Sequence, residues 1–305
     1  IFLSLFIFFF FHKTSKDNPS NFFLMSKETA IIINNWFMMY FLSVVLIGTI
    51  YPIFLDVLSS QKISVGPPFY HKLIIPFLIP FLLIMAIGPK LKWIKSNLED
   101  KIYLFTLLII SILLSIFIIK NFSSNFLINT ILISCALYLF FITLRDFFSK
   151  RFKNLAQNTA HFGFSLLILS ILFNSLFSSE IITNLKVGQT FENTKAKIVF
   201  ESLNQKEGEN YKSIIGNFIV QDSKGKIENL SPELRIYNQP NITTSEADIK
   251  TTLLSDKFMV INIVQNQEFF NVRYQVKPFM LWIWISVILI SFGGLISFVK
   301  KEYEK

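Results

Sequence analysis

Cysteine is nearly absent from this sequence, which limits the chemistry that its side chains can carry alone. Cys135 is the only cysteine among 305 residues, so a disulfide framework, a thiol zinc site and a thioredoxin-like pair are excluded. Any redox chemistry must therefore use a bound cofactor. The sequence also lacks a Walker loop, a dinucleotide-binding fingerprint, a nucleophile elbow and a zinc-protease pattern, and its acidic residues show no spacing typical of a catalytic pair. No catalytic residue is assigned.

A basic surface for nucleic acid is absent too, although the formal net charge is +9. Residues 180–277 form the one large polar region, and they contain 12 basic and 12 acidic side chains. A neutral region of this kind offers no stripe of cations for phosphates, so a nucleic-acid partner is excluded. The surplus positive charge lies in short loops between apolar segments, where it indicates membrane topology.

Apolar residues are abundant, with 52% hydrophobic residues, 36 phenylalanines and a mean hydropathy of +0.51. This composition predicts a polytopic α-helical membrane protein with about seven spans. The expected spans are 1–11, 35–54, 73–87, 102–119, 126–144, a segment that contains His161 and ends at Phe177, and 279–299. The first is only about 17 Å long as a helix, against a hydrocarbon core of about 30 Å. We therefore expect the sequence to begin inside a helix whose upstream part is missing.

The distribution of Lys and Arg predicts the orientation of the spans. The loops 12–28, 89–101 and 145–153 and the tail 300–305 contain fourteen of these residues, whereas the short loops on the opposite side contain three. The positive-inside rule places the first set in the cytoplasm and residues 180–277 outside. His161 then lies toward the cytoplasmic leaflet.

The external region alternates between apolar and polar residues in the manner of β-strands. Strands are predicted at 195–203, 214–222, 227–237, 258–264 and 269–276, with a hairpin turn at 223–226 and a short helix at 244–254. The expected domains are a transmembrane helical bundle (1–179), a β-rich external domain (180–277), and a last helix with a cytoplasmic tail (278–305).

His161 is the strongest candidate for a functional residue, because an ionisable side chain within an apolar span is costly unless it is paired or bound. Histidine is also the commonest metal ligand. Ala156, Ala160, Thr159 and Gly163 surround it with small side chains, so that a neighbouring backbone or a flat ligand could approach closely. We interpret His161 as an axial ligand of haem iron. The alternative is an imidazole that is hydrogen-bonded to a neighbouring helix.

Other candidate positions have simpler interpretations. His71 is expected in an external loop, roughly 20–30 Å from His161, and so cannot share its iron. His12 is expected at a helix end, where an imidazole is usually solvated, so a second axial ligand is expected upstream of this sequence. Gly66-Pro67-Pro68-Phe69-Tyr70 is either a rigid turn or a surface that contacts a ligand or partner. Trp282 and Trp284 are expected in an interfacial aromatic belt.

An ordered series of motifs resembles the C-terminal half of the CcmF family of cytochrome c maturation proteins. The series covers nearly the whole chain, although no single motif is decisive. It consists of Ser26-Lys27-Glu28 with Asn34-Asn35, Gly48-Thr49-Ile50-Tyr51-Pro52, Ile63-Ser64-Val65-Gly66-Pro67-Pro68-Phe69-Tyr70, Ile87-Gly88-Pro89, Ala160-His161-Phe162-Gly163, Ser231-Pro232-Glu233 and Thr243-Thr244-Ser245-Glu246.

The resemblance implies a haem-handling membrane subunit of the bacterial system that attaches haem covalently to apocytochrome c. It implies haem b held by two transmembrane histidines, of which His161 matches the second. The first ligand, a tryptophan-rich segment and two external histidines would precede Ile1, so this chain is not expected to be active alone. The implied location is the bacterial inner membrane, and the implied partners are a haem chaperone, other haem lyase subunits, apocytochrome c and a quinol. The alternatives are a transporter or channel subunit, and a non-catalytic scaffold of an assembly complex.

Overall fold

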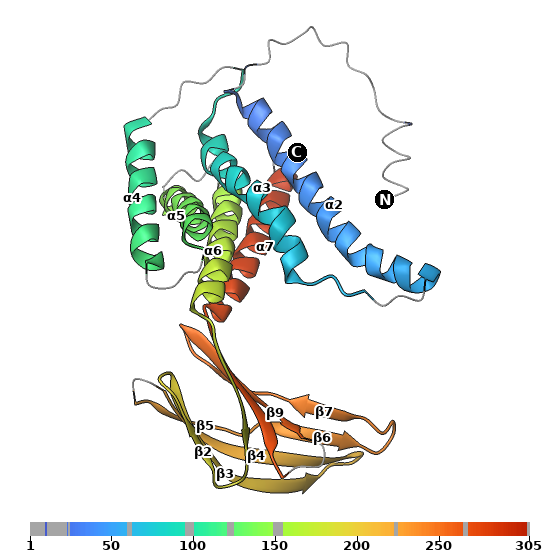
Figure 1. Ribbon diagram of the computed structural model, residues 1–305. Helices are drawn as coiled ribbons and strands as arrows, with labels where there is room; N and C mark the ends of the chain where they lie inside the picture. The colour runs from blue at the N-terminus through green and yellow to red at the C-terminus, as the bar shows by residue number, and fades with distance from the viewer. Residues whose placement is uncertain are drawn as a thin grey trace. The chain divides into compact units, whose positions relative to one another are not determined.

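The computed structural model describes residues 10, 23, 25–59, 63–94, 101–120, 125–148, 155–222, 225–264 and 268–303. Within these residues, six helices are long and apolar enough to cross a membrane, and a β-sandwich is inserted before the last of them (Figure 1). The predicted fold class, a polytopic helical membrane protein with a β-rich domain, is confirmed. The predicted first span at 1–11 lies almost entirely outside the described residues. The chain divides into two compact units, Ile1–Leu113 and Leu114–Lys305.

The first unit contains helix α2 (Lys27–Ser59), helix α3 (Pro67–Ile87), the short 3-10 helix η1 (Gly88–Lys90) and most of helix α4 (Lys101–Ile119). Ser26 caps the beginning of α2, because its hydroxyl accepts a hydrogen bond from the Thr29 amide at 3.2 Å. The helix is longer than the apolar stretch 35–54. Backbone groups beyond the hydrocarbon can be solvated, so hydropathy locates the centre of a span better than its ends.

The segment 66–70 was expected to lie in a loop, and that prediction is wrong. Pro67 is the first residue of α3, where the missing amide hydrogen is not needed and the fixed φ angle suits a helix. Tyr70 packs against α2 at Gly48, where an added Cβ would lie 2.7 Å from the Tyr70 hydroxyl oxygen. The contact supports a structural role for this motif. His71 consequently belongs to a helix and is exposed.

The second unit contains the end of α4 together with α5 (Phe126–Phe148), α6 (Leu155–Phe177), the sandwich and α7 (Met280–Tyr303). Hydroxyl groups join its helices. The hydroxyl oxygens of Ser115 and Ser134 lie 2.6 Å apart between α4 and α5, and those of Thr143 and Ser165 lie 2.7 Å apart between α5 and α6. Such pairs satisfy polar groups that lipid could not hydrate.

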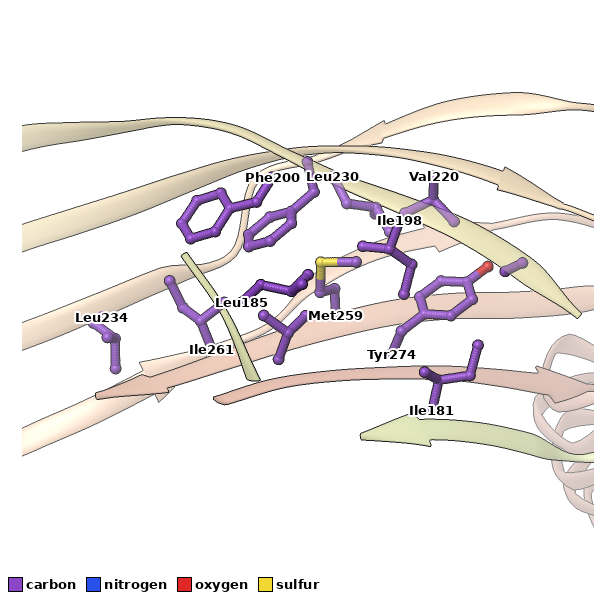
Figure 2. Packing of buried hydrophobic residues seen from close by; sticks show 13 residues of the cluster. Ile181, Leu185, Ile198, Phe200, Val220, Leu230, Leu234, Met259, Ile261 and Tyr274 are labelled. Carbon is purple, nitrogen blue, oxygen red and sulfur yellow. The ribbon is translucent and has the colours of Figure 1, made fainter. Parts of the chain in front are cut away.

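The sandwich consists of two antiparallel sheets. Its strands are β1 (Ser179–Leu185), β2 (Thr190–Glu192), β3 (Ala196–Glu207), β4 (Tyr211–Asp222), β5 (Ile227–Leu230), β6 (Glu233–Tyr237), β7 (Thr243–Glu246), β8 (Asp248–Thr251), β9 (Ser255–Ile263) and β10 (Phe270–Pro278). One sheet has the order β1-β10-β9-β8, and the other has the order β2-β3-β4-β6-β7 with β5 also paired to β4. Figure 2 shows Phe200, Met259 and Ile261 between the sheets, where each is fully buried.

Two details of the predicted sandwich differ from the structure. The helix predicted at 244–254 is wrong, because β7 and β8 occupy this segment and pair with β6 and β9. The single strand predicted at 227–237 is divided at Pro232, which has no amide hydrogen for a sheet ladder. The predicted hairpin turn is confirmed by the pairing of β4 with β5 and by Gly225 at φ +79°, although residues 223–224 lie outside the described part.

The sandwich joins its helices with almost no linker. One residue, Ser178, separates α6 from β1, and one residue, Phe279, separates β10 from α7. Strands β1 and β10 pair along their length, from Ser179 opposite Val276 to Leu185 opposite Phe270. The ten strands therefore form an insertion within a pair of antiparallel helices.

Candidate functional site: the His161 face of helix α6

One side of α6 is covered by α5. The Asn158 side-chain amide donates a hydrogen bond to the Asp146 carbonyl oxygen at 2.7 Å. One turn later, the ring of Phe162 stacks on Phe147 with centroids 4.9 Å apart. Together with the hydroxyl pair at Ser165, these contacts define an α5-facing stripe along α6.

A second side of α6 is covered by α7, and small residues bring the two helices close together. An added Cβ at Gly163 would lie 2.9 Å from the Ile290 backbone nitrogen. At Gly293, an added Cβ would lie 2.7 Å from the Ala160 backbone nitrogen and 2.9 Å from the Ala156 carbonyl oxygen. From the sequence, either a neighbouring backbone or a flat ligand could approach these small residues. In the structure, the α7 backbone lies against them. The small residues therefore serve helix packing.

His161 lies on a third side of α6. At about 100° per residue, it is roughly 70° from the centre of the α5-facing stripe and roughly 140° from the centre of the α7-facing one. Its side chain is half-buried, and Gln157, Phe164 and Ile168 occupy the same stripe. The imidazole has no hydrogen-bond partner among the residues that the structure describes. It lies about 9 Å along the helix axis from Leu155, on a stripe that is offset from both the α5 contacts and the α7 contacts.

Neither of the other histidines belongs to the described part of the second unit. His71 belongs to α3 in the first unit, and His12 lies outside the described residues. In the described ranges, no group of three or more His, Cys, Asp or Glu side chains could hold a metal ion. His161 is thus a single candidate ligand of the kind that haem iron uses at one face.

The sandwich contains an ionic cluster that sequence reasoning missed. The Lys257 ammonium lies 3.1 Å from a Glu228 carboxylate oxygen and 3.3 Å from one of Asp222, and the Lys257 residue is only 8% exposed. Burial acts to raise the pKa of Glu228, but hydrogen bonds from Lys226 and Lys257 outweigh it and lower that pKa. Burial, with the nearby carboxylates, raises the pKa of the Tyr274 hydroxyl.

This cluster has the character of a structural ion network. Its acids and bases are paired with one another, and Lys257 of one sheet faces Asp222 and Glu228 of the other, which lie 35 and 29 positions away along the chain. Periodicity alone could not find it, because strand alternation marks Lys257 as an inward position without indicating which carboxylates face it.

Comparisons with known proteins agree with this architecture. A family model described as the CcmF C-terminal beta-sandwich matches residues 176–278. The cytochrome c-type biogenesis protein CcmF of Pseudomonas fluorescens is 29% identical over 298 residues, covering 92% of this chain and 45% of the relative. CcmF of Escherichia coli (strain K12) is 25% identical, with 92% and 45% covered. The chain spans about half the length of the curated relatives it matches.

A solved structure named Cytochrome c Heme Lyase CcmF is similar with a TM-score of 0.68 and 19% identity. The similarity covers 90% of this chain and 46% of that one, and at this identity it establishes the fold. The sandwich boundaries from the family model, 176–278, agree with strands that run from Ser179 to Pro278. The sequence matches, the sandwich and the fold together show that the chain is similar to the C-terminal part of CcmF proteins.

Proposed function

We propose that this chain is part of a cytochrome c haem lyase membrane subunit and that His161 is an axial ligand of a b-type haem. The observation that carries the proposal is a half-buried imidazole within a spanning helix, without a hydrogen-bond partner in the described residues and on a stripe offset from the α5 and α7 contacts. An imidazole in an apolar span needs a partner, and iron ligation would supply one.

The residues around His161 fit such a ligand. Phe164 and Ile168 lie on the same stripe of α6 and offer apolar surface beside the imidazole. The α5 contacts at Asn158 and Phe162 and the α7 contacts at Gly163 hold the helix on its two other sides, so they orient the His161 side chain. A bound haem would supply one-electron chemistry that this chain's own side chains lack.

The proposed reaction is the attachment of haem vinyl groups to cysteine thiols of apocytochrome c. This chain alone is not expected to perform it. The proposed partners are a haem chaperone, the other haem lyase subunits and apocytochrome c, with a quinol as electron donor. The proposed location is the bacterial inner membrane, with the sandwich in the periplasm and the C-terminus in the cytoplasm, as the distribution of Lys and Arg indicates.

The test is the visible absorption spectrum of the protein purified in complex with its natural partners. His161→Ala should lose the spectrum of the b-type haem while the protein still inserts, because the surrounding apolar helix can still span. His71→Ala is the matched control, since it removes an imidazole from a helix of the other unit, and it should keep the spectrum. An unchanged haem spectrum in His161→Ala, with normal protein yield, would show that the ligand assignment is wrong.

A further inference from the structure

The turn between β8 and β9 presents two adjacent leucines on the surface. Leu253 and Leu254 form its tip and are 69% and 66% exposed. The Thr252 hydroxyl accepts a hydrogen bond from the Ser255 amide at 3.1 Å, and the Thr252 amide donates to the Ser255 carbonyl oxygen at 3.0 Å. The turn is therefore closed on itself. Tight turns on a water-exposed sandwich usually contain Gly, Asn, Asp or Ser at such positions, so two leucines there call for an explanation.

This turn is bonded to the beginning of the last spanning helix. The Phe279 amide donates a hydrogen bond to the Leu254 carbonyl oxygen at 2.8 Å. The indole N–H of Trp282 donates to the Leu253 carbonyl oxygen at 2.9 Å. Because α7 begins at Met280 and meets the criteria for a membrane span, the leucine backbone lies beside the first turn of a transmembrane helix.

Helix α6 also contacts this end of the sandwich, and so fixes the position of the turn relative to the helices. The Asn174 side-chain amide of α6 donates to the Pro278 carbonyl oxygen at 2.6 Å. The ring of Phe279 lies against Phe173 of α6, with centroids 5.5 Å apart. Two spanning helices therefore hold this end of the sandwich, and the leucines cannot move far from the level at which the helices enter the membrane.

We propose that Leu253 and Leu254 insert into the bilayer and anchor the sandwich to lipid acyl chains. Tryptophan is enriched where a span meets the headgroups, and its N–H commonly finds a partner there, so the bond from Trp282 places the turn at that level. Trp284, two residues further along α7, is 63% exposed, as expected for a second tryptophan at the level where a span meets the headgroups. This anchoring does not depend on haem binding at His161.

The same sheet supplies a matched control. Ile263 is an exposed apolar residue, 47% accessible, at the opposite end of β9. It pairs with Phe270 at the far end of the β9–β10 ladder, whereas Ser255 pairs with Pro278 next to α7. Eight residues of strand separate the two ends, which corresponds to about 26 Å. Ile263 has no hydrogen-bonded connection to a spanning helix in the described structure.

The experiment places a nitroxide spin label at Leu253→Cys, Leu254→Cys or Ile263→Cys in the full chain, reconstituted in lipid nanodiscs. Cys135 is buried at 6% exposure, and the protein without an added cysteine serves as the labelling blank. Power saturation then compares collisions with oxygen, which concentrates in lipid, and with a polar nickel chelate, which stays in water. The expected result is a higher oxygen-to-nickel ratio at 253 and 254 than at 263.

Two outcomes would overturn the proposal. Nickel accessibility at 253 and 254 equal to that at 263 would show that the turn is in water. Low accessibility to both reagents would show that another protein segment or subunit covers it. Quenching of a bimane label at the same cysteines by brominated lipid gives a second readout, and it should be strong at 253 and 254 and weak at 263. Because both leucines are exposed, neither substitution removes a core contact.

Discussion

The β-sandwich and the helices α4–α7 both bury apolar side chains, but they differ in what else they bury and in what they expose. The largest fully buried residues of the sandwich are apolar, such as Phe200 and Phe218, whose rings stack 4.2 Å apart. The helices bury apolar residues such as Leu139 too, but they also bury hydroxyl groups such as that of Ser115 and leave large side chains such as Phe117 exposed. Water drives the sandwich to close around an apolar core. Lipid provides no such force, so small residues and hydroxyl pairs hold the helices.

The largest effect is expected from opening the sandwich core. Phe200→Ala should destabilise the sandwich by about 3–5 kcal/mol, because the substitution leaves a cavity between the two sheets. The matched variant Phe117→Ala removes the same side chain from the 69% exposed surface of α4 and should change stability little in a bilayer. Hydrogen exchange of peptides from β3 and α4, measured in nanodiscs, gives the two free energies of opening. Equal losses would contradict the proposed difference between the regions.

The next effect is expected from the ionic cluster of the sandwich. Lys257→Met should cost about 3 kcal/mol, because it leaves the carboxylates of Glu228 and Asp222 partly buried without their shared cation. Lys212→Met is the control, since Lys212 forms a 3.8 Å ion pair with Glu207 in which both side chains are well exposed. An exposed pair of this kind is worth about 1 kcal/mol or less. The measurement is hydrogen exchange of β4 and β9 peptides, and similar effects of both variants would show that the cluster is not a buried network.

The close approach of α6 and α7 predicts that substitution of Gly293, but not of its neighbour Gly294, destabilises the helices. The loss should be smaller than that of Lys257→Met. Gly293→Ala should destabilise the helix pair by about 1–3 kcal/mol, because its Cβ would lie 2.7 Å from the backbone of Ala160. Gly294→Ala meets nothing within 4 Å and should be neutral or slightly stabilising in a helix. Thermal unfolding of the two variants in detergent tests this difference. A tolerant Gly293 would mean that the two helices do not cross at these residues.

The lowered pKa of Glu228 predicts a dependence on pH that is confined to the sandwich. The folded-state pKa of Glu228 lies below the ordinary value of 4.5. The stability that the ionised carboxylate contributes is therefore fully present above pH 4.5 and is lost as the pH falls through the folded-state pKa. Glu228→Gln should remove this part of the acid sensitivity. The measurement is hydrogen exchange of β5 peptides at pH 7, 5 and 3. Between about pH 5 and pH 3, the free energy of opening should fall less steeply in the variant than in the unchanged protein. The same pH dependence in both proteins would show that Glu228 is not responsible for this acid sensitivity.

The smallest effect is expected from the hydroxyl pair between α4 and α5. Ser134→Ala should cost about 0.6 kcal/mol, the average that such hydrogen bonds contribute within a membrane. Its partner Ser115 also donates to the Thr130 carbonyl oxygen at 3.1 Å, so it keeps an acceptor after the substitution. Unfolding of the helices in mixed micelles measures this value. A loss as large as that of Phe200→Ala would show that this hydroxyl pair stabilises the helices as strongly as the apolar core stabilises the sandwich.

Sequence patterns predicted the spanning segments and most strands, but they could not predict contacts between distant segments. Hydropathy located α5 and α7 because each needs a long apolar stretch to cross lipid. The helix predicted at 244–254 was wrong because its residues lack a strong period, and pairing with β6 and β9 decides their conformation. At the candidate site, the sequence indicated His161 because it is an ionisable residue in a span. It could not predict which side of α6 faces α7, because that contact depends on Gly293, over a hundred residues away.

The short connections of the sandwich have a mechanical consequence. Since Ser178 and Phe279 are the only residues between the spanning helices and the paired strands β1 and β10, a tilt of the sandwich has no hinge segment in which to be absorbed. Torque applied to the sandwich, for instance by a bound polypeptide, would pass directly into α6 and α7. His161 lies on one of these two helices, so the imidazole and the sandwich would turn together as one rigid body.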